Sequence, residues 1–225
     1  MHINPLFPFL KFNHHLHINM KRITCLLLIF AGLIAGCNSN KNKSTAGAQR
    51  INPAVMLDSI TKARTRIDSL FNQNKERLIV FAKISGQEEP IRITNRKFPK
   101  QVHTTFNILK DSSGNIITIS EFPYSESGDW SIILTHYFDK MGRTFAHKRQ
   151  ADFYNSICTD GMAHQTRLEY FDNPFKLIKR TESLVDDQNN PLKKDNCQFP
   201  YEYEYKISED LGKYLRINKL SINKR

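Results

Sequence analysis

The chain has 225 residues, of which 40% are hydrophobic and 24% charged, with a formal net charge of +11 at pH 7. This length and apolar content exclude a wholly disordered chain and allow one domain with a substantial core. The basic residues are spread along the chain and interleaved with acidic ones, which argues against a nucleic-acid-binding protein, since such proteins gather basic residues in one patch.

A segment near the N-terminus has the order of a bacterial export signal. Lys21 and Arg22 form a short positive stretch, and residues 23–36 carry no charge. An uncharged run of this length suits a signal-peptide core, whereas a membrane-spanning helix needs roughly 20 residues. Ala35 and Gly36 end the run with small side chains, which a peptidase requires, and Cys37 follows directly.

The string Leu33-Ile34-Ala35-Gly36-Cys37 resembles the lipobox of bacterial lipoproteins. The resemblance implies that a signal peptide, residues 20–36, is removed and that Cys37 carries lipid and attaches the protein to a membrane. An ordinary signal peptide or a transmembrane anchor with an incidental cysteine is the alternative. Residues 1–19 precede this signal and are interpreted as a mis-called start.

Residues 37–50 comprise the lipidated cysteine and a tether rich in Asn, Ser and Lys, which cannot bury enough apolar surface to fold. By resemblance, Asn38 directly after the cysteine favours the outer membrane, facing the periplasm. Removal of residues 1–37 takes away Lys11, Lys21 and Arg22 and lowers the net charge from +11 to +8. We interpret the remaining charge as a solvated basic surface, with attraction to anionic lipid or cell-wall polymer as the alternative.

Residues 51–225 are predicted to form a single domain that begins with a helix. Asn52 can cap the helix and Pro53 suits its first turn. Apolar residues then recur at helical spacing over about 20 residues; they are Met56, Ile60, Ala63, Ile67 and Leu70. We expect this narrow apolar stripe to pack on a sheet.

Beyond Asn74 the apolar period changes to two, which predicts strands at Arg77–Ile84 and Ile91–Thr94. Three later units each consist of a strand, an aspartate, two loop residues, a fourth position and another strand. The aspartates are Asp111, Asp139 and Asp172. Asp followed three residues later by Gly closes a hairpin, because Asp accepts backbone N–H groups and Gly adopts the left-handed conformation.

The third unit has Phe175 in place of that glycine, after Pro174, and is expected to turn differently. The string Tyr137–Arg143 of the second unit resembles the Tyr-Asp hairpin repeats of bacterial surface proteins. A last hairpin is predicted around Glu209–Gly212, between strands at Tyr201–Ile207 and Tyr214–Ile217.

These elements together predict an α+β fold. One N-terminal amphipathic helix is expected to pack on a twisted antiparallel β-meander of roughly seven to nine strands.

Two of the four cysteines remain for the domain, since Cys25 leaves with the signal and Cys37 is used for lipid. Cys158 and Cys197 are predicted to form a disulfide in an oxidising compartment. A catalytic or metal-binding thiol is the alternative, but neither cysteine has a CxxC partner or an adjacent histidine.

Aromatic residues are the strongest candidates for ligand contacts. Tyr201, Tyr203 and Tyr205 would share one face of a strand, and Trp130 lies at the start of another. They either form a platform for a ligand or belong to the core, and we favour the core. Lys148 and Arg149, with Gln150 and Asp152, mark the far end of a long, partly solvated strand.

The histidines of the domain are His103, His136, His147 and His164, and none is at metal-ligand spacing. His136 and His147 are expected to face one another across a hairpin. No catalytic residue, metal or cofactor is predicted. An enzyme would require a polar pocket that gathers His103, His136 or His164 with Asp160.

The leading hypothesis is a lipid-anchored cell-envelope protein with a non-catalytic binding domain. Its ligand would be an envelope protein, a glycan or a cell-wall component. The alternatives are a periplasmic hydrolase or hydrolase inhibitor, and a carrier of lipid or lipopolysaccharide. The sequence does not specify an oligomeric state.

Overall fold

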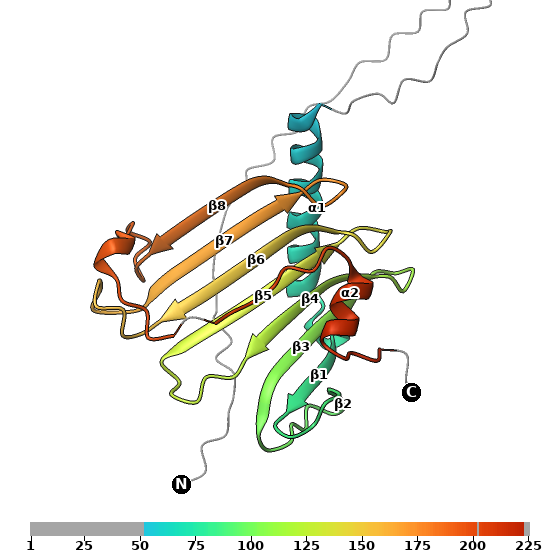
Figure 1. Cartoon of the computed structure of the whole chain (residues 1–225), viewed down its shortest axis with the longest axis horizontal. Helices are drawn as coiled ribbons and strands as arrows, with labels where there is room; N and C mark the ends of the chain where they lie inside the picture. Colours follow the sequence, from blue (N-terminus) through green and yellow to red (C-terminus); the bar gives the residue numbers. More distant parts are fainter. Residues whose placement is uncertain (1–51, 202, 223–225) are drawn as a thin grey trace, which may run out of the picture. The chain divides into compact units, whose positions relative to one another are not determined.

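A single eight-stranded antiparallel sheet dominates the computed structural model, which describes residues 52–201 and 203–222 (Figure 1). The described residues belong to one compact unit. The predicted start, signal peptide, Cys37 and tether lie outside these residues.

The strands follow one another across the sheet in the order β2-β1-β3-β4-β5-β6-β7-β8. Their bounds are β1 Ile79–Ile84, β2 Ile91–Ile93, β3 Val102–Lys110, β4 Ile116–Pro123, β5 Trp130–Phe138, β6 Thr144–Phe153, β7 Ala163–Phe171 and β8 Leu177–Val185. From β3 to β8 each strand pairs with the next through a hairpin, which is a meander. The predicted fold class is therefore confirmed.

The N-terminal helix α1 runs from Pro53 to Gln73. The Asn52 side chain caps it by accepting a 2.9 Å hydrogen bond from the Ala54 N–H. Ile67 is buried in a cluster with Tyr137 and Tyr170 of the sheet, as the apolar stripe predicts. Ile60 is partly buried against the same cluster, whereas Ala63 of the predicted stripe is exposed, so Ile60 and Ile67 hold the helix on the sheet.

Three hairpin turns have one geometry. In each, the N–H of the aspartate bonds to the carbonyl four residues later, and its side chain accepts backbone N–H groups of the turn. Gly114, Gly142 and Phe175 all adopt positive φ, at 85°, 76° and 77°. The expectation that the third turn differs is wrong, because Phe175 takes the left-handed conformation and stacks on Phe171 at 4.4 Å.

A fourth copy of this turn follows β8 and was not predicted. Asp186 accepts the backbone N–H groups of Gln188 and Asn190, and Asn189 takes positive φ at 65°. Asn is the residue other than glycine that most readily adopts this conformation.

The predicted last hairpin is wrong. Residues 203–208 are extended but belong to no strand, and residues Leu211–Ile217 form helix α2. Asp210 does not open a hairpin turn, because its side chain accepts the Lys213 N–H and caps the helix. The described residues 198–201 and 203–222 are called the C-terminal strap below.

Different elements pack on the two faces of the sheet. α1 packs on one side, over Tyr137, Ala146 and Tyr170. The C-terminal strap packs on the other side, over two further apolar clusters (Figure 1). These clusters contain Trp130, Ile132, Leu134, Ala151 and Phe153, and Phe81, Phe106, Ile108, Ile119 and Phe138.

Candidate functional site

The disulfide between Cys158 and Cys197 is present, as predicted. Cys158 lies in the loop between β6 and β7, and Cys197 directly precedes the strap. The bond therefore joins the beginning of the strap to the loop that connects β6 and β7.

The four candidate aromatic residues gather on the strap side. Trp130 is 8% exposed and stacks on Tyr201, with ring centroids 4.4 Å apart. Tyr203 packs in the same cluster, and its hydroxyl donates to the Glu121 carboxylate at 3.3 Å. Tyr205 stacks on the buried ring of His147. Trp130 is a core residue, Tyr203 and Tyr205 are partly buried and pack against its cluster, and Tyr201 is 40% exposed.

Burial perturbs the groups in this layer. Desolvation raises the pKa of the Glu121 carboxyl, although hydroxyls of Tyr214 and Tyr203 donate to it. Desolvation and the nearby Glu121 raise the pKa of Tyr203 to about 12, so its hydroxyl stays protonated and acts as a donor.

The histidines of the enzyme hypothesis are not brought together. His136 and His147 pair across β5 and β6 on the strap side, as predicted, whereas His164 pairs with Asp152 on the α1 side. His103 lies at the start of β3 and is exposed. Asp160 lies in the loop between β6 and β7. The side-chain hydrogen bonds of His103, His136 and His164 among the described residues go to other groups.

A largely polar surface of the sheet lies on the α1 side, beyond the strand positions that α1 contacts. One rung across β5 to β8 carries Ile133, Gln150, Thr166 and Ser183. The next rung carries Ser131, Asp152, His164 and Val185. All eight residues are partly or fully exposed, and the six polar ones are called the open polar face.

His164 is bound on both ring nitrogens by carboxylates. Its Nδ1 lies 2.7 Å from Asp152 Oδ1 and its Nε2 lies 3.0 Å from Asp187 Oδ1. Carboxylates only accept hydrogen bonds, so both contacts are satisfied when both ring nitrogens donate, that is, when the ring is protonated. Partial burial lowers the pKa of His164, but the two carboxylates outweigh it and the pKa is raised overall.

Asp187 connects this cluster to the disulfide loop. Its other carboxylate oxygen accepts the Met162 N–H at 3.0 Å. A Cβ on Gly161 would overlap that carboxylate, so only glycine leaves room for it. A hollow of about 670 Å³ lies between this loop and the turn after β8, lined by Thr159, Asp160, Asp186 and Gln188 among others.

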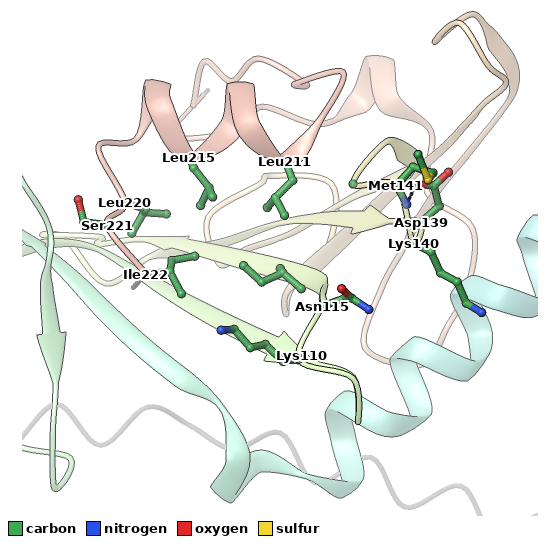
Figure 2. A pocket seen from close by; sticks show the side chains of 13 residues that line it. Lys110, Asn115, Asp139, Lys140, Met141, Leu211, Leu215, Leu220, Ser221 and Ile222 are labelled. Carbon is green, nitrogen blue, oxygen red and sulfur yellow. Dashed lines mark hydrogen bonds between the residues drawn. The ribbon is translucent and has the colours of Figure 1, made fainter. Parts of the chain in front are cut away.

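A second hollow, of about 740 Å³, lies beneath α2 (Figure 2). Leu211, Leu215, Leu220 and Ile222 point into it from the strap. Residues of the β3–β4 and β5–β6 turns form its rim, including Lys110, Asn115 and Met141. It is an open surface hollow with an apolar wall.

No protein-family model, curated protein or solved structure is significantly similar to this chain. Within residues 52–201 and 203–222, no group of three or more His, Cys, Asp or Glu side chains could hold a metal ion. Neither helix in that part of the chain has the length and hydropathy needed to cross a membrane. We therefore infer function from the geometry of the described surface.

Sequence reasoning found part of the open polar face. The sequence indicated a partly solvated strand end at Lys148, Arg149, Gln150 and Asp152, and Lys148, Gln150 and Asp152 are partly exposed. Arg149, in contrast, is buried beneath the strap, with 7% exposure. The residues of β7 and the role of Asp187 were missed, because the register that aligns them cannot be derived from one strand.

Proposed function

We propose that this protein is a lipid-anchored cell-envelope protein whose domain binds a hydroxyl-rich polymer, such as a cell-wall glycan, through the open polar face. The binding is non-catalytic. The anchor is the lipid on Cys37, and the membrane is the outer membrane, with the domain facing the periplasm.

The rung Gln150–Thr166–Ser183 is the observation that carries this proposal. These three side chains come from adjacent strands, and among the described residues none forms a hydrogen bond. Neighbouring strands are spaced about 4.8 Å apart, so the rung presents donors and acceptors at a regular interval. A polymer of hydroxylated rings offers matching groups, and unbound amides and hydroxyls at partly exposed positions can exchange water for such a ligand.

The neighbouring charged rung supports the same surface. The Ser131 hydroxyl donates to Asp152 Oδ2 at 3.0 Å, and His164 holds the other oxygen of that carboxylate. Hydrogen bonds among Ser131, Asp152 and His164 hold these side chains in place beside the Gln150–Thr166–Ser183 rung. A ligand on that rung would therefore meet side chains that need little reordering.

The proposed location is supported by two features. The lipobox resemblance implies export, and the Cys158–Cys197 disulfide suits an oxidising compartment.

The alternatives fare differently. The hydrolase hypothesis loses the histidine cluster that it required, since His136 and His164 lie on opposite sides of the sheet. The lipid-carrier hypothesis keeps one supporting observation, the leucine-lined hollow beneath α2 (Figure 2).

A sedimentation assay tests the proposal. Mature protein purified from membranes in detergent is mixed with insoluble cell-wall sacculi, and the bound fraction is measured across protein concentrations. The variant Gln150→Ala/Thr166→Val/Ser183→Ala is expected to lose about tenfold or more in affinity, since several hydrogen bonds of about 1 kcal/mol each are removed.

The matched control makes the same three chemical changes elsewhere. Ser59→Ala/Gln87→Ala/Thr94→Val alters exposed residues far from the open polar face in sequence and should bind like the wild type. Equal binding by both variants, or no binding by the wild type to sacculi, would contradict the proposal. Competition by detergent-solubilised lipid at the α2 hollow would favour the carrier instead.

A further inference from the structure

The C-terminal strap is held on the sheet by side-chain contacts and by isolated backbone hydrogen bonds rather than by a continuous strand ladder. The backbone bonds run from the Gln198 N–H to Ser156, from the Thr144 N–H to Glu209 and from the Leu211 N–H to Gly142. Its start is fixed by Cys197, and its end is the apolar packing of α2. Between them, the Ser208 N–H donates to His136 Nε2 at 3.1 Å, and the Thr144 hydroxyl donates to the Ser208 carbonyl at 2.7 Å. One of the contacts at the middle of the strap therefore requires a histidine that acts as an acceptor.

Two imidazoles are buried together at this joint. His136 and His147 are 2% and 0% exposed, and their ring centroids are 4.8 Å apart. Tyr214 of α2 lies against His136 at 4.7 Å, and Tyr205 of the strap stacks on His147 at 5.3 Å. Both rings are thus covered by the strap.

The joint accommodates only neutral rings. His136 Nδ1 and both nitrogens of His147 have no hydrogen-bond partner. The nearest acceptor to His147 is Glu169 Oε2, at 3.9 Å from Nδ1, which is beyond hydrogen-bonding distance. A proton added to His136 would have to occupy Nε2, which already accepts the Ser208 N–H.

The surrounding charges do not compensate two imidazolium rings. Glu169 of β7 is the acid nearest His147, and it is already paired with Arg180 of β8 at 2.7 Å. Arg149 of β6 and Arg167 of β7 oppose a positive His147, and Arg167 is paired with Glu182. From β4, Glu121 faces the strap through the hydroxyls of Tyr203 and Tyr214; from the strap, Glu209 pairs with Lys213.

We propose that His136 and His147 make the strap an acid-released cover, which detaches from the sheet when these rings take up protons and uncovers the apolar surface around Trp130. The disulfide between Cys158 and Cys197 keeps the released strap attached to the β6–β7 loop. This device is independent of the ligand proposed for the open polar face, which lies on the opposite side.

The direction of the effect follows from the burial of the rings. Desolvation lowers the pKa of both histidines below the ordinary value of about 6.5. The neighbouring His147 adds to this effect at His136, whereas at His147 desolvation outweighs Glu169, which raises the pKa. Above about pH 6.5 the rings of His136 and His147 are neutral whether the strap is docked or released, so docking is fully favoured there. Below that pH the released state binds protons that the docked state does not, so docking weakens as pH falls.

Trp130 provides a direct readout, because it is the single tryptophan of the chain and stacks on Tyr201 of the strap. The full mature protein is titrated from pH 8 to pH 4.5, and Trp130 emission is recorded beside the far-ultraviolet circular dichroism of the sheet. Hydrogen exchange of the Ser208 amide, corrected for its intrinsic rate, is measured over the same range. We expect the emission to shift, and Ser208 protection to fall by about tenfold per pH unit for each proton taken up, before the sheet signal changes.

The variant His147→Phe keeps a ring to stack on Tyr205 but cannot titrate, and it should shift the emission transition to lower pH. His103→Gln, at an exposed position at the start of β3, is the matched control and should leave that transition in place. If emission and Ser208 protection stay constant until the sheet itself unfolds, the proposal is overturned. Should His147→Phe not fold, nuclear magnetic resonance of the wild type decides: His136 and His147 rings that protonate while Ser208 remains protected also overturn it.

Discussion

Phe175 occupies in the β7–β8 turn the backbone position that Gly142 occupies in the β5–β6 turn, with φ of 77° and 76°. A side chain in this region costs roughly 1 kcal/mol relative to glycine. Phe175 offsets that cost by stacking on Phe171.

The first prediction separates strain from stacking at this turn. Phe175→Ala loses the stack and keeps the strain, whereas Phe175→Gly loses both. We expect the glycine variant to be about 1 kcal/mol more stable than the alanine variant by urea denaturation. Gly142→Ala should cost about the same 1 kcal/mol, because a Cβ there meets only Leu211 Cβ at an ordinary 3.5 Å. Equal stability of the two Phe175 variants would show that the backbone is not strained.

The second prediction concerns the disulfide. Cys158→Ser/Cys197→Ser opens a loop of sequence separation 39 and should lower the free energy of unfolding by about 3–4 kcal/mol in the chain-entropy model. Denaturant unfolding of the wild type with and without reductant, beside the variant, measures this. Identical midpoints for oxidised wild type and variant would contradict the prediction.

The third prediction concerns the polar anchor of α1. Asp68 accepts the Tyr137 hydroxyl at 2.5 Å, pairs with Arg64 and lies 3.5 Å from Lys148 Nζ. Burial and the Asp68 charge hold the pKa of Tyr137 well above its usual range, so that hydroxyl donates at every physiological pH.

Asp68→Ala leaves these partly buried donors without their acceptor and should lower the free energy of unfolding by about 2–3 kcal/mol. The control is Asp58→Ala, which breaks an exposed pair with Lys62 and should cost under about 0.5 kcal/mol. Similar losses for both variants in thermal unfolding would argue that Asp68 is only a surface partner.

The fourth prediction is the pH dependence of the His164 cluster. Its folded pKa is raised, so the stabilisation is complete below the ordinary pKa of about 6.5 and is lost as pH rises through the folded value. Resonances of the His164 ring should report a pKa above the ordinary value of about 6.5, and Met162 amide protection should fall as His164 deprotonates. Gly161→Ala, which displaces Asp187, should lower the His164 pKa. A His164 pKa at or below that ordinary value would refute the double carboxylate contact.

The parts of the fold that the sequence predicts are those set by local chemistry. Asn52, Pro53 and the apolar stripe fix α1, and Asp111 and Asp139, each with a glycine three residues later, fix two hairpins. The fourth turn has a weaker signal, since Asn189 stands where Gly114 does, and asparagine adopts the left-handed conformation less readily than glycine.

The C-terminal strap was misread because alternation alone does not decide between a strand and an extended cover. Tyr203 and Tyr205 place their rings on one side in either case, and only the sheet beneath them decides which contacts form. A helical signal was present after Asp210, in the apolar spacing of Leu211, Tyr214 and Leu215 behind an N-cap residue.

The candidate site depends on cross-strand register, which links Gln150 to Thr166 and Thr166 to Ser183. Bulges near the hairpin turns shift that register, as between Tyr137 and Phe138. A single sequence does not reveal where such a shift falls, so the rung could not be predicted.

The central claim is that this domain works at a membrane surface through lipid on Cys37. Mass spectrometry of the N-terminal peptide, from protein extracted from bacterial membranes, tests it most directly. We predict that the mature chain begins at Cys37 and carries the added mass of acyl chains, and that Cys37→Ala abolishes both the modification and membrane fractionation. An unmodified Cys37, or a mature chain that retains residues before it, would contradict the claim.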